Sequence, residues 1–242
     1  MLEFVMITGC GHTGTTLLAR IMGVHSKIYN PPYETNLFLA YNVLKWNSLL
    51  EEHYSDAKKS KEDCMVFLEK TPRHIWHIDY ARKAILNAKF ILMTRNGRDV
   101  IASLYERSGD IQASILRYKD DSLLTIRQLD EQSVLLVRYE DLIINTNSEL
   151  TKIMSFINLK FEESILNFHE SKVNWFNLKD TTKGNGKGDG VEHDKLRNWQ
   201  VNQPIFATSK LWNERIPREH WGEVDQFFKD CGDEIMQKFG YF

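Results

Sequence analysis

The sequence is poor in cysteine and proline and contains no long apolar run. Only three of its 242 residues are cysteine, and only five are proline. The cysteines, Cys10, Cys64 and Cys231, are widely separated and odd in number, which argues against a disulfide framework and a cysteine-rich zinc site. This cysteine usage favours a reducing compartment.

Neither sign of charge dominates. The 31 lysines and arginines nearly balance 33 aspartates and glutamates, which gives a net charge of −2. This balance argues against a general nucleic-acid binder and a membrane-surface protein, but it allows a local basic pocket. The first apolar run, FVMIT, is too short for a signal peptide or a membrane span. We therefore expect a cytoplasmic protein that does not cross a membrane, and a lumenal domain with a trimmed N-terminus is the alternative.

Short apolar runs alternate with helical patterns along most of the chain. Four runs predict buried strands, and they read FVMIT, CMVFLEK, KFILMTR and SVLLVRYEDL. Helical spacing follows these runs, and we also expect a helix from Thr35 to about Tyr54, before a polar surface stretch. Strands that alternate with helices predict an α/β fold, with a central parallel sheet flanked by helices. No internal repeat or boundary is evident, so we expect a single domain over residues 1–242.

The segment TGCGHTGTT, Thr8 to Thr16, has the glycine spacing of a phosphate-binding loop. It lies between a predicted strand and a predicted helix, where backbone N–H groups and the helix N-terminus attract an anion. The usual lysine after Gly14 is absent. Because that lysine reaches the β- and γ-phosphates in NTPases, its absence argues against a nucleoside triphosphate. We expect a shorter phosphate, with added hydroxyl donors from Thr13, Thr15 and Thr16.

Arg95 and Ser103 predict a second phosphate site. Arg95 ends the third predicted strand, and Ser103 follows eight residues later, on roughly the same face of the next helix. A fixed guanidinium and a hydroxyl make a suitable clamp for a phosphate. The alternative is a surface arginine near an unrelated helical serine.

Four motifs in this order, GCGHTGTTLL, EKTPRH, TRNGRDVIASLY and VRYEDL, resemble those of the sulfotransferases that use 3'-phosphoadenosine 5'-phosphosulfate (PAPS). The resemblance runs from Thr8 to about Leu142 and points to the bacterial, carbohydrate and protein-tyrosine branches. It implies a P-loop NTPase-like sulfotransferase fold and sulfuryl transfer from PAPS to an acceptor hydroxyl or amine, with no metal. The product nucleotide would be 3'-phosphoadenosine 5'-phosphate (PAP). The acceptor would be a small molecule, a carbohydrate or a peptide, and the fold does not decide between them.

The resemblance also implies roles for the two phosphate sites. Arg95 and Ser103 would bind the 3'-phosphate, and the glycine loop would bind the 5'-phosphosulfate. His12 stands where the family commonly has arginine or lysine, which offsets charge on the bridging oxygen as sulfate leaves. A histidine can do this if protonated, or it can donate one hydrogen bond if neutral. The loop residues concerned are Gly11, His12, Thr13, Gly14, Thr15 and Thr16.

A base must take the proton of the acceptor. Glu34, in the stiff loop NPPYETN, is the expected base, and several of the resembled branches carry a glutamate at about this place. The alternative for Glu34 is to cap the helix expected from Thr35. His74 and Glu69, in EKTPRH at the end of the second predicted strand, are the other candidates for the base, because α/β sheets gather their sites at strand ends.

Lys70 is the expected cation for the transferring group, and an exposed ion pair with Glu69 or Asp79 is the alternative. His74 and His77 have a spacing that metal ligands can use, but no third ligand is evident, so we expect no metal.

Residues 180–195 are rich in glycine, lysine and aspartate and predict a long loop. This loop could close over the donor as a lid, or it could be a mobile surface loop. The lid would carry cations to the 3'-phosphate, and Trp199 would cover the donor or pack in the core. The cations concerned are Lys183, Lys187, Lys195 and Arg197.

Two other functions compete with sulfuryl transfer. One is a P-loop kinase-like phosphotransferase, against which the missing lysine and the lack of a clear Mg²⁺ site argue. The other is a catalytically inactive nucleotide-binding module, which the departure at His12 makes worth testing.

Overall fold

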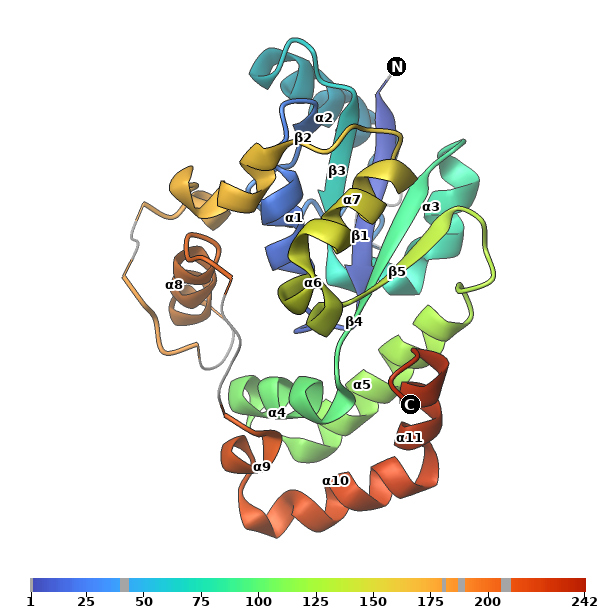
Figure 1. Cartoon of the computed structure of the whole chain (residues 1–242), viewed down its shortest axis with the longest axis vertical. Coiled ribbons are helices and arrows are strands. Elements are labelled where there is room, and N and C mark those ends of the chain that lie inside the picture. The colour runs from blue at the N-terminus through green and yellow to red at the C-terminus, as the bar shows by residue number, and fades with distance from the viewer. Residues whose placement is uncertain (1, 40–43, 180–181, 187–189, 206–209) are drawn as a thin grey trace.

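The structure is a computed structural model that describes residues 2–39, 44–179, 182–186, 190–205 and 210–242. Within these residues, five parallel strands form one sheet in the order β2-β3-β1-β4-β5 (Figure 1). The strands are β1 (Glu3–Gly9), β2 (Ile28–Tyr29), β3 (Val66–Lys70), β4 (Lys89–Thr94) and β5 (Val134–Arg138). The predicted α/β fold with a parallel sheet is confirmed, and each strand expected from the sequence is present.

Helices cover both faces of the sheet, which explains why its strands read as near-continuous apolar runs. Along β1, Val5 and Ile7 belong to one core, and Phe4 and Met6 belong to the core on the opposite side. The first side is covered by α1 (Thr15–Met22), α6 (Tyr139–Ile144) and α7 (Thr146–Phe156) (Figure 1). The second side is covered by α2 (Trp46–Ser60), a 3₁₀ helix (Pro72–His77) and α3 (Ile78–Ala84).

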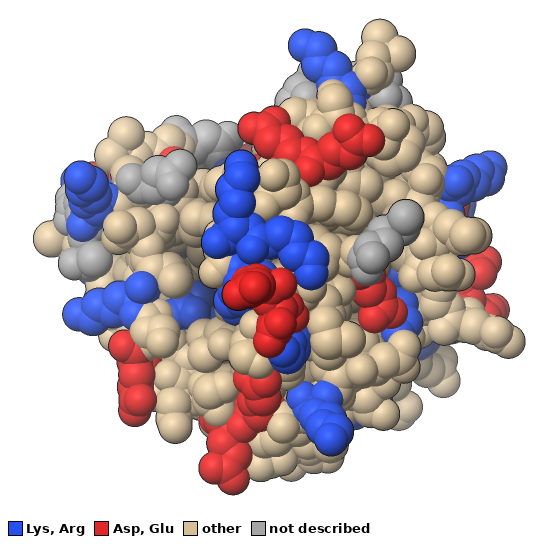
Figure 2. Space-filling model, turned by 90° about the horizontal axis from the view of Figure 1, so that it is seen from above, with Lys and Arg blue, Asp and Glu red and all other residues tan. Residues whose placement is uncertain are grey.

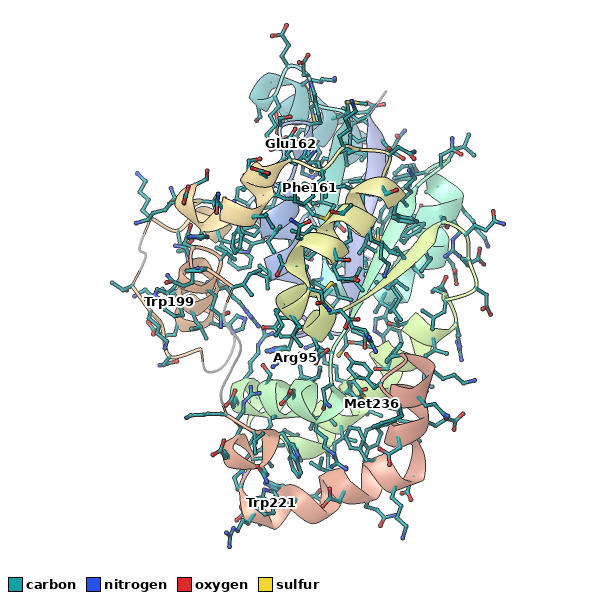
Figure 3. The ribbon with its side chains drawn as sticks, viewed as in Figure 1. Arg95, Phe161, Glu162, Trp199, Trp221 and Met236 are labelled. Carbon is teal, nitrogen blue, oxygen red and sulfur yellow. The ribbon has the colours of Figure 1, made fainter. Side chains whose placement is uncertain are left out.

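A third apolar core lies beyond the ends of the strands. There, α4 (Gly97–Ser108) and α5 (Ile111–Ile126) pack against the C-terminal helices α9 (Trp212–Arg215), α10 (Trp221–Phe227) and α11 (Asp233–Lys238). Figure 3 shows Trp221 and Met236 in this part of the molecule and Arg95 between it and the sheet. Helix α8 (Val191–Gln200) lies apart, to one side of the sheet (Figure 1).

Charged side chains of both signs are interspersed on the face shown in Figure 2. This distribution accords with the near-zero net charge of the sequence. No helix in the described part of the chain is both long and apolar enough to cross a membrane.

The helix expected from Thr35 to about Tyr54 is wrong in its first part. Residues 35–39 are irregular, residues 40–43 lie outside the described ranges, and α2 begins only at Trp46. The left-handed backbone of Asn36, with φ of 53°, interrupts any helix there. At its other end α2 runs to Ser60, through residues expected to be a polar surface stretch. Strand β2 was not predicted, because its two residues are too few to show the alternating pattern of a strand.

Gly9 turns the chain from β1 into the glycine loop. Its φ is 132°, a conformation that side chains rarely adopt, and a Cβ atom placed there would lie 2.4 Å from the carbonyl oxygen of Met93. Glycine is therefore required by backbone conformation and by the close approach of β4.

We predict that Gly9→Ala lowers the free energy of unfolding by at least about 2 kcal/mol, because it adds backbone strain to a clash with β4. Gly222→Ala is the matched control, since its added Cβ would meet nothing within 4 Å and Gly222 lies within α10. This control should be neutral, or stabilising by up to about 1 kcal/mol. Denaturant unfolding measures the free energy of unfolding of both variants. An equal change in the two would contradict the requirement for glycine at position 9.

Candidate active site

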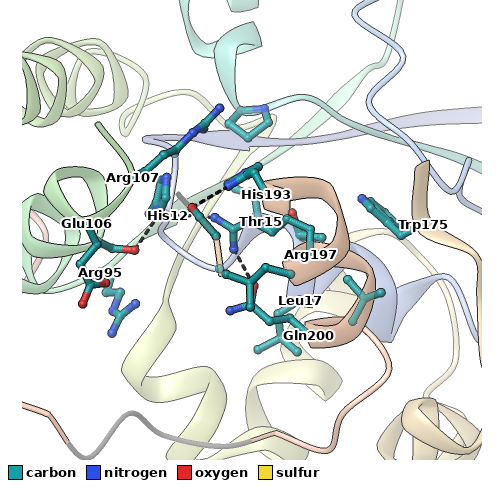
Figure 4. Close-up of a pocket in the computed structure, with 18 of the residues that line it drawn as sticks. His12, Thr15, Leu17, Arg95, Glu106, Arg107, Trp175, His193, Arg197 and Gln200 are labelled. Carbon is teal, nitrogen blue, oxygen red and sulfur yellow. Dashed lines mark hydrogen bonds between the residues drawn. The ribbon is translucent and has the colours of Figure 1, made fainter. Parts of the chain in front are cut away.

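A cavity of about 1300 Å³ lies where the strands end. In α/β sheets this is the edge that binds ligands. The volume exceeds the range of about 300–1,000 Å³ that is usual for small-molecule pockets, so there is room for a nucleotide and part of a second molecule. The predicted residues that line it are Gly11, His12, Gly14, Thr15, Thr16, Glu34, Arg95, Ser103, Lys183 and Arg197. Figure 4 shows His12, Thr15, Arg95 and Arg197 around this space.

The glycine loop presents its backbone and the start of α1 to the cavity. Gly14 is the N-cap of α1, with φ of 93° and no side-chain cap. The first amide groups of α1 therefore have no side-chain acceptor at the cap, which leaves them suited to an anion. Thr13 differs from expectation: its hydroxyl is buried and donates to the Cys10 carbonyl over 2.7 Å, so it stabilises the loop itself.

His12 is neutral and carries its proton on Nε2. Its Nδ1 lies 3.3 Å from a guanidinium nitrogen of Arg197 and 2.7 Å from Oγ of Ser103. Arginine can only donate, so Nδ1 accepts and the N–H is on Nε2. Burial lowers the pKa of His12 well below its ordinary value, and the charges of Arg197 and Arg117 lower it further. Within the described residues, the buried Nε2 has no hydrogen-bond partner.

Arg95, at the end of β4, and Ser103, on α4, line the same cavity. The guanidinium of Arg95 stacks on Tyr139, 4.6 Å from the ring centroid, and lies 3.9 Å from the carboxylate of Asp99. Its buried Nε has no partner among the residues that the structure describes. Ser103 bonds to His12, so it connects the predicted second phosphate site to the glycine loop.

Lys70 and Glu34 form a partly buried ion pair of 2.8 Å. The side chain of Lys70 is fully buried, whereas that of Glu34 is 33% exposed and lines the cavity. Burial lowers the pKa of Lys70, and the Glu34 carboxylate partly offsets this shift. Lys70 therefore pairs with Glu34, not with Glu69 or Asp79. Its ammonium also lies 5.2 Å from the ring centroid of Trp175.

Glu69 and His74, the other candidates for the base, are both fully buried and do not line the cavity. Nδ1 of His74 lies 2.9 Å from Oε2 of Glu69, and Nε2 accepts a hydrogen bond of 3.1 Å from the amide of Phe38. Both ring nitrogens are thus engaged within the protein, and neither is available to a substrate in the cavity. Burial raises the pKa of Glu69, but His74 and two threonine hydroxyls outweigh it, so the net pKa is lowered.

The expected lid is partly helical. Residues 191–195 belong to α8, which brings Arg197 to the cavity, and burial lowers the pKa of Arg197 to about 10. Lys195 is 3.5 Å from Glu192 on the same helix and does not line the cavity. Lys183 does line it and lies 4.8 Å from the ring centroid of Trp199. Lys187 lies outside the described residues.

Several lining residues gave no sequence signal. Trp175 lines the cavity from the start of a short 3₁₀ helix (Trp175–Asn177), and its buried Nε1 has no partner within the described ranges. Arg107, Arg117 and His193 also line it, from α4, α5 and α8. Trp175 follows no strand and belongs to no motif, so only the folded chain shows that it reaches the site.

No three metal-ligating side chains gather in the described residues as they would around an ion. Cys10, in the glycine loop, is enclosed, and burial and the nearby Asp121 raise the pKa of its thiol. The thiol is therefore not activated by the start of α1.

Comparisons with known proteins agree with the fold. A sequence profile of the sulfotransferase family matches residues 48–163. A putative protein-tyrosine sulfotransferase of Caenorhabditis briggsae is 24% identical over 198 residues, which covers 69% of this chain and 70% of that protein. Protein-tyrosine sulfotransferase A of Caenorhabditis elegans is 20% identical over 272 residues, which covers 98% of this chain and 67% of that protein.

Solved structures of sulfotransferases share the fold. A sulfotransferase domain from the curacin biosynthetic pathway superposes with a TM-score of 0.59 at 14% identity, covering 96% of this chain and 98% of that one. Mouse sulfotransferase SULT7A1, complexed with PAP, superposes with a TM-score of 0.52 at 14% identity, covering 95% and 83%. The chain is thus similar in sequence to sulfotransferases over residues 48–163, and it shares their fold.

The lowered pKa of Glu69 predicts how stability depends on pH. A carboxyl whose pKa is lower in the folded state than its ordinary value of 4.5 stabilises the fold above that pH, and this contribution is lost as pH falls through the folded pKa. The stability deficit of Glu69→Gln should therefore be largest above pH 4.5 and shrink in acid. Denaturant unfolding at several pH values measures this, with exposed Glu51→Gln as the control. A deficit that does not change with pH would contradict it.

Proposed function

We propose that the protein transfers a sulfuryl group from PAPS to an acceptor hydroxyl or amine. Three buried donors without partners in the described structure carry this proposal: Nε2 of His12, Nε of Arg95 and Nε1 of Trp175. All three residues line the cavity with the glycine loop. A buried donor left unpaired costs about 1–3 kcal/mol, so their convergence indicates a ligand rich in anionic oxygens.

In this proposal PAPS binds with its 5' end at the glycine loop and its 3'-phosphate toward α4. The amides of Gly11 and Gly14 to Thr16 would bind the 5'-phosphosulfate, and Arg95 with Ser103 would bind the 3'-phosphate. Arg197 would add a second guanidinium beside the loop. The lack of the usual loop lysine suits a single phosphate at this end better than a triphosphate. The PAP complex of the structurally similar mouse enzyme supports the choice of nucleotide.

Glu34 is the base in this proposal. Its partly exposed carboxylate takes the proton of the acceptor as the acceptor oxygen or nitrogen bonds to sulfur. The bond between sulfur and the bridging phosphate oxygen breaks, and its electron pair leaves with PAP. The Nε2–H of His12 would donate to the oxygen on which negative charge develops, and the buried Lys70 ammonium, which does not itself line the cavity, would add the field of its positive charge. His74 has no part in this assignment because Glu69 and the Phe38 amide engage both of its ring nitrogens, and Lys195 has none because it pairs with Glu192 on α8.

PAP should raise the melting temperature, whereas ATP with Mg²⁺ should not. A ligand at about 100 times its Kd adds roughly 2.7 kcal/mol of stability. Arg95→Ala should remove most of this stabilisation. Arg98→Ala is the matched control, because Arg98 pairs with Asp225 outside the cavity. Stabilisation by ATP with Mg²⁺ alone would favour the kinase-like alternative.

Glu34→Gln should lower the rate of PAPS turnover about 10²- to 10⁴-fold, because the amide cannot take the acceptor proton. PAP should bind this variant as before. The assay is PAP release with a panel of sugars, peptides and small hydroxyl compounds. Glu149→Gln, which breaks a Glu–Lys pair on α7, is the control and should turn over normally. Normal turnover by Glu34→Gln would remove Glu34 as the base, and PAP binding without turnover by the unmodified protein would favour an inactive binding module.

A further inference from the structure

Three polar side chains next to the active site take no part in the proposed reaction. Glu69, Thr71 and His74 come from the end of β3 and the segment after it, and all three are fully buried. Polar groups in such a position are costly unless each finds a partner. Their partners show what they hold in place.

The Glu69 carboxylate accepts three hydrogen bonds from side chains. Its Oε1 accepts from the hydroxyls of Thr35 and Thr71 over 2.9 and 2.6 Å. Its Oε2 lies 2.9 Å from Nδ1 of His74. Because the Phe38 amide donates to Nε2 of His74, the proton of the imidazole is on Nδ1 and points to Glu69. A single set of proton positions therefore satisfies the whole group.

The same side chains bind three consecutive backbone amides of the irregular segment after Glu34. The amide of Asn36 donates to Oγ1 of Thr71 over 3.2 Å, and the amide of Leu37 donates to Oγ1 of Thr35 over 3.3 Å. The amide of Phe38 donates to Nε2 of His74 over 3.1 Å. These side chains replace the backbone partners that a helix or a sheet would provide.

Glu69 and Lys70 are neighbours on β3 and point to opposite faces of the sheet. Lys70 binds the Glu34 carboxylate, and Glu69 binds the residues that follow Glu34. One strand end thus holds the segment from both sides.

We propose that Glu69, Thr71 and His74 are positioning residues that fix segment 35–38 and thereby hold Glu34 in place to act as the base. The inference rests on the function proposed above. Displacing a catalytic group by about 1 Å can cost roughly 10²-fold in rate, so loss of this anchor should lower turnover while the donor site stays intact.

Thr71→Val tests the anchor because it removes the bonds to Asn36 and Glu69 with little change in volume. Thr71→Ser keeps the hydroxyl and should behave like the unmodified protein. Thr125→Val is the matched control, because it removes a buried hydroxyl that donates to the Asp121 carbonyl on α5. If Thr71→Val does not fold, Glu69→Gln takes its place.

Two readouts separate positioning from a general loss of stability. Hydrogen exchange of the Asn36 amide should speed up about tenfold in Thr71→Val and stay unchanged in the other two variants. With PAPS and an acceptor found in the panel, kcat should fall about tenfold or more, while KM for PAPS and the affinity for PAP stay within about twofold.

Unchanged exchange at Asn36, or faster exchange with an unchanged kcat, would overturn the inference. An equal loss of kcat in Thr125→Val would also overturn it. If the unmodified protein consumes no PAPS, the proposed function fails and the catalytic part of this inference fails with it. The exchange rates would still show whether the three side chains hold the segment.

Discussion

The buried ammonium of Lys70 is the constraint on which the site depends. An isolated charge in such a position costs several kcal/mol, and the Glu34 carboxylate at 2.8 Å offsets that cost. The pair brings the irregular segment after β2 to the end of β3. The same segment receives a second contact, because the amide of Phe176 donates to the Pro32 carbonyl over 2.7 Å. Trp175, next to Phe176, then lies against Lys70 and forms part of the cavity wall.

On the other side of the cavity, a neutral histidine joins elements that are distant in the sequence. Nδ1 of His12 contacts Ser103 of α4 and Arg197 of α8, so the glycine loop, the second predicted phosphate site and α8 meet at one ring. Three neighbouring arginines make protonation of this ring unfavourable in addition to burial. A neutral Nε2–H can donate to a leaving oxygen but cannot neutralise it, so the proposed chemistry leaves the positive charge to Lys70 and to the guanidinium groups.

The sequence allowed the sheet and the glycine loop to be predicted because both depend on local patterns. Apolar runs predicted the main strands, and glycine spacing placed the loop after β1. The Glu34–Lys70 pair was not predicted, since its residues are 36 positions apart and no pattern in the sequence links them. The helix expected from Thr35 failed because side chains of Thr71 and His74 bind its backbone amides. Trp175 was missed because no motif marks it.

The most direct test of the account is a crystal structure of the protein with PAP bound. We expect the 5'-phosphate on the amides of Gly11 and Gly14 to Thr16, with Nε2 of His12 donating to one of its oxygens. We expect the 3'-phosphate beside Arg95 and Ser103, and an open space between the 5'-phosphate and Glu34 for the sulfuryl group and acceptor. PAP bound away from the glycine loop, or a 5'-phosphate on the far side of the loop from Glu34, would contradict the account.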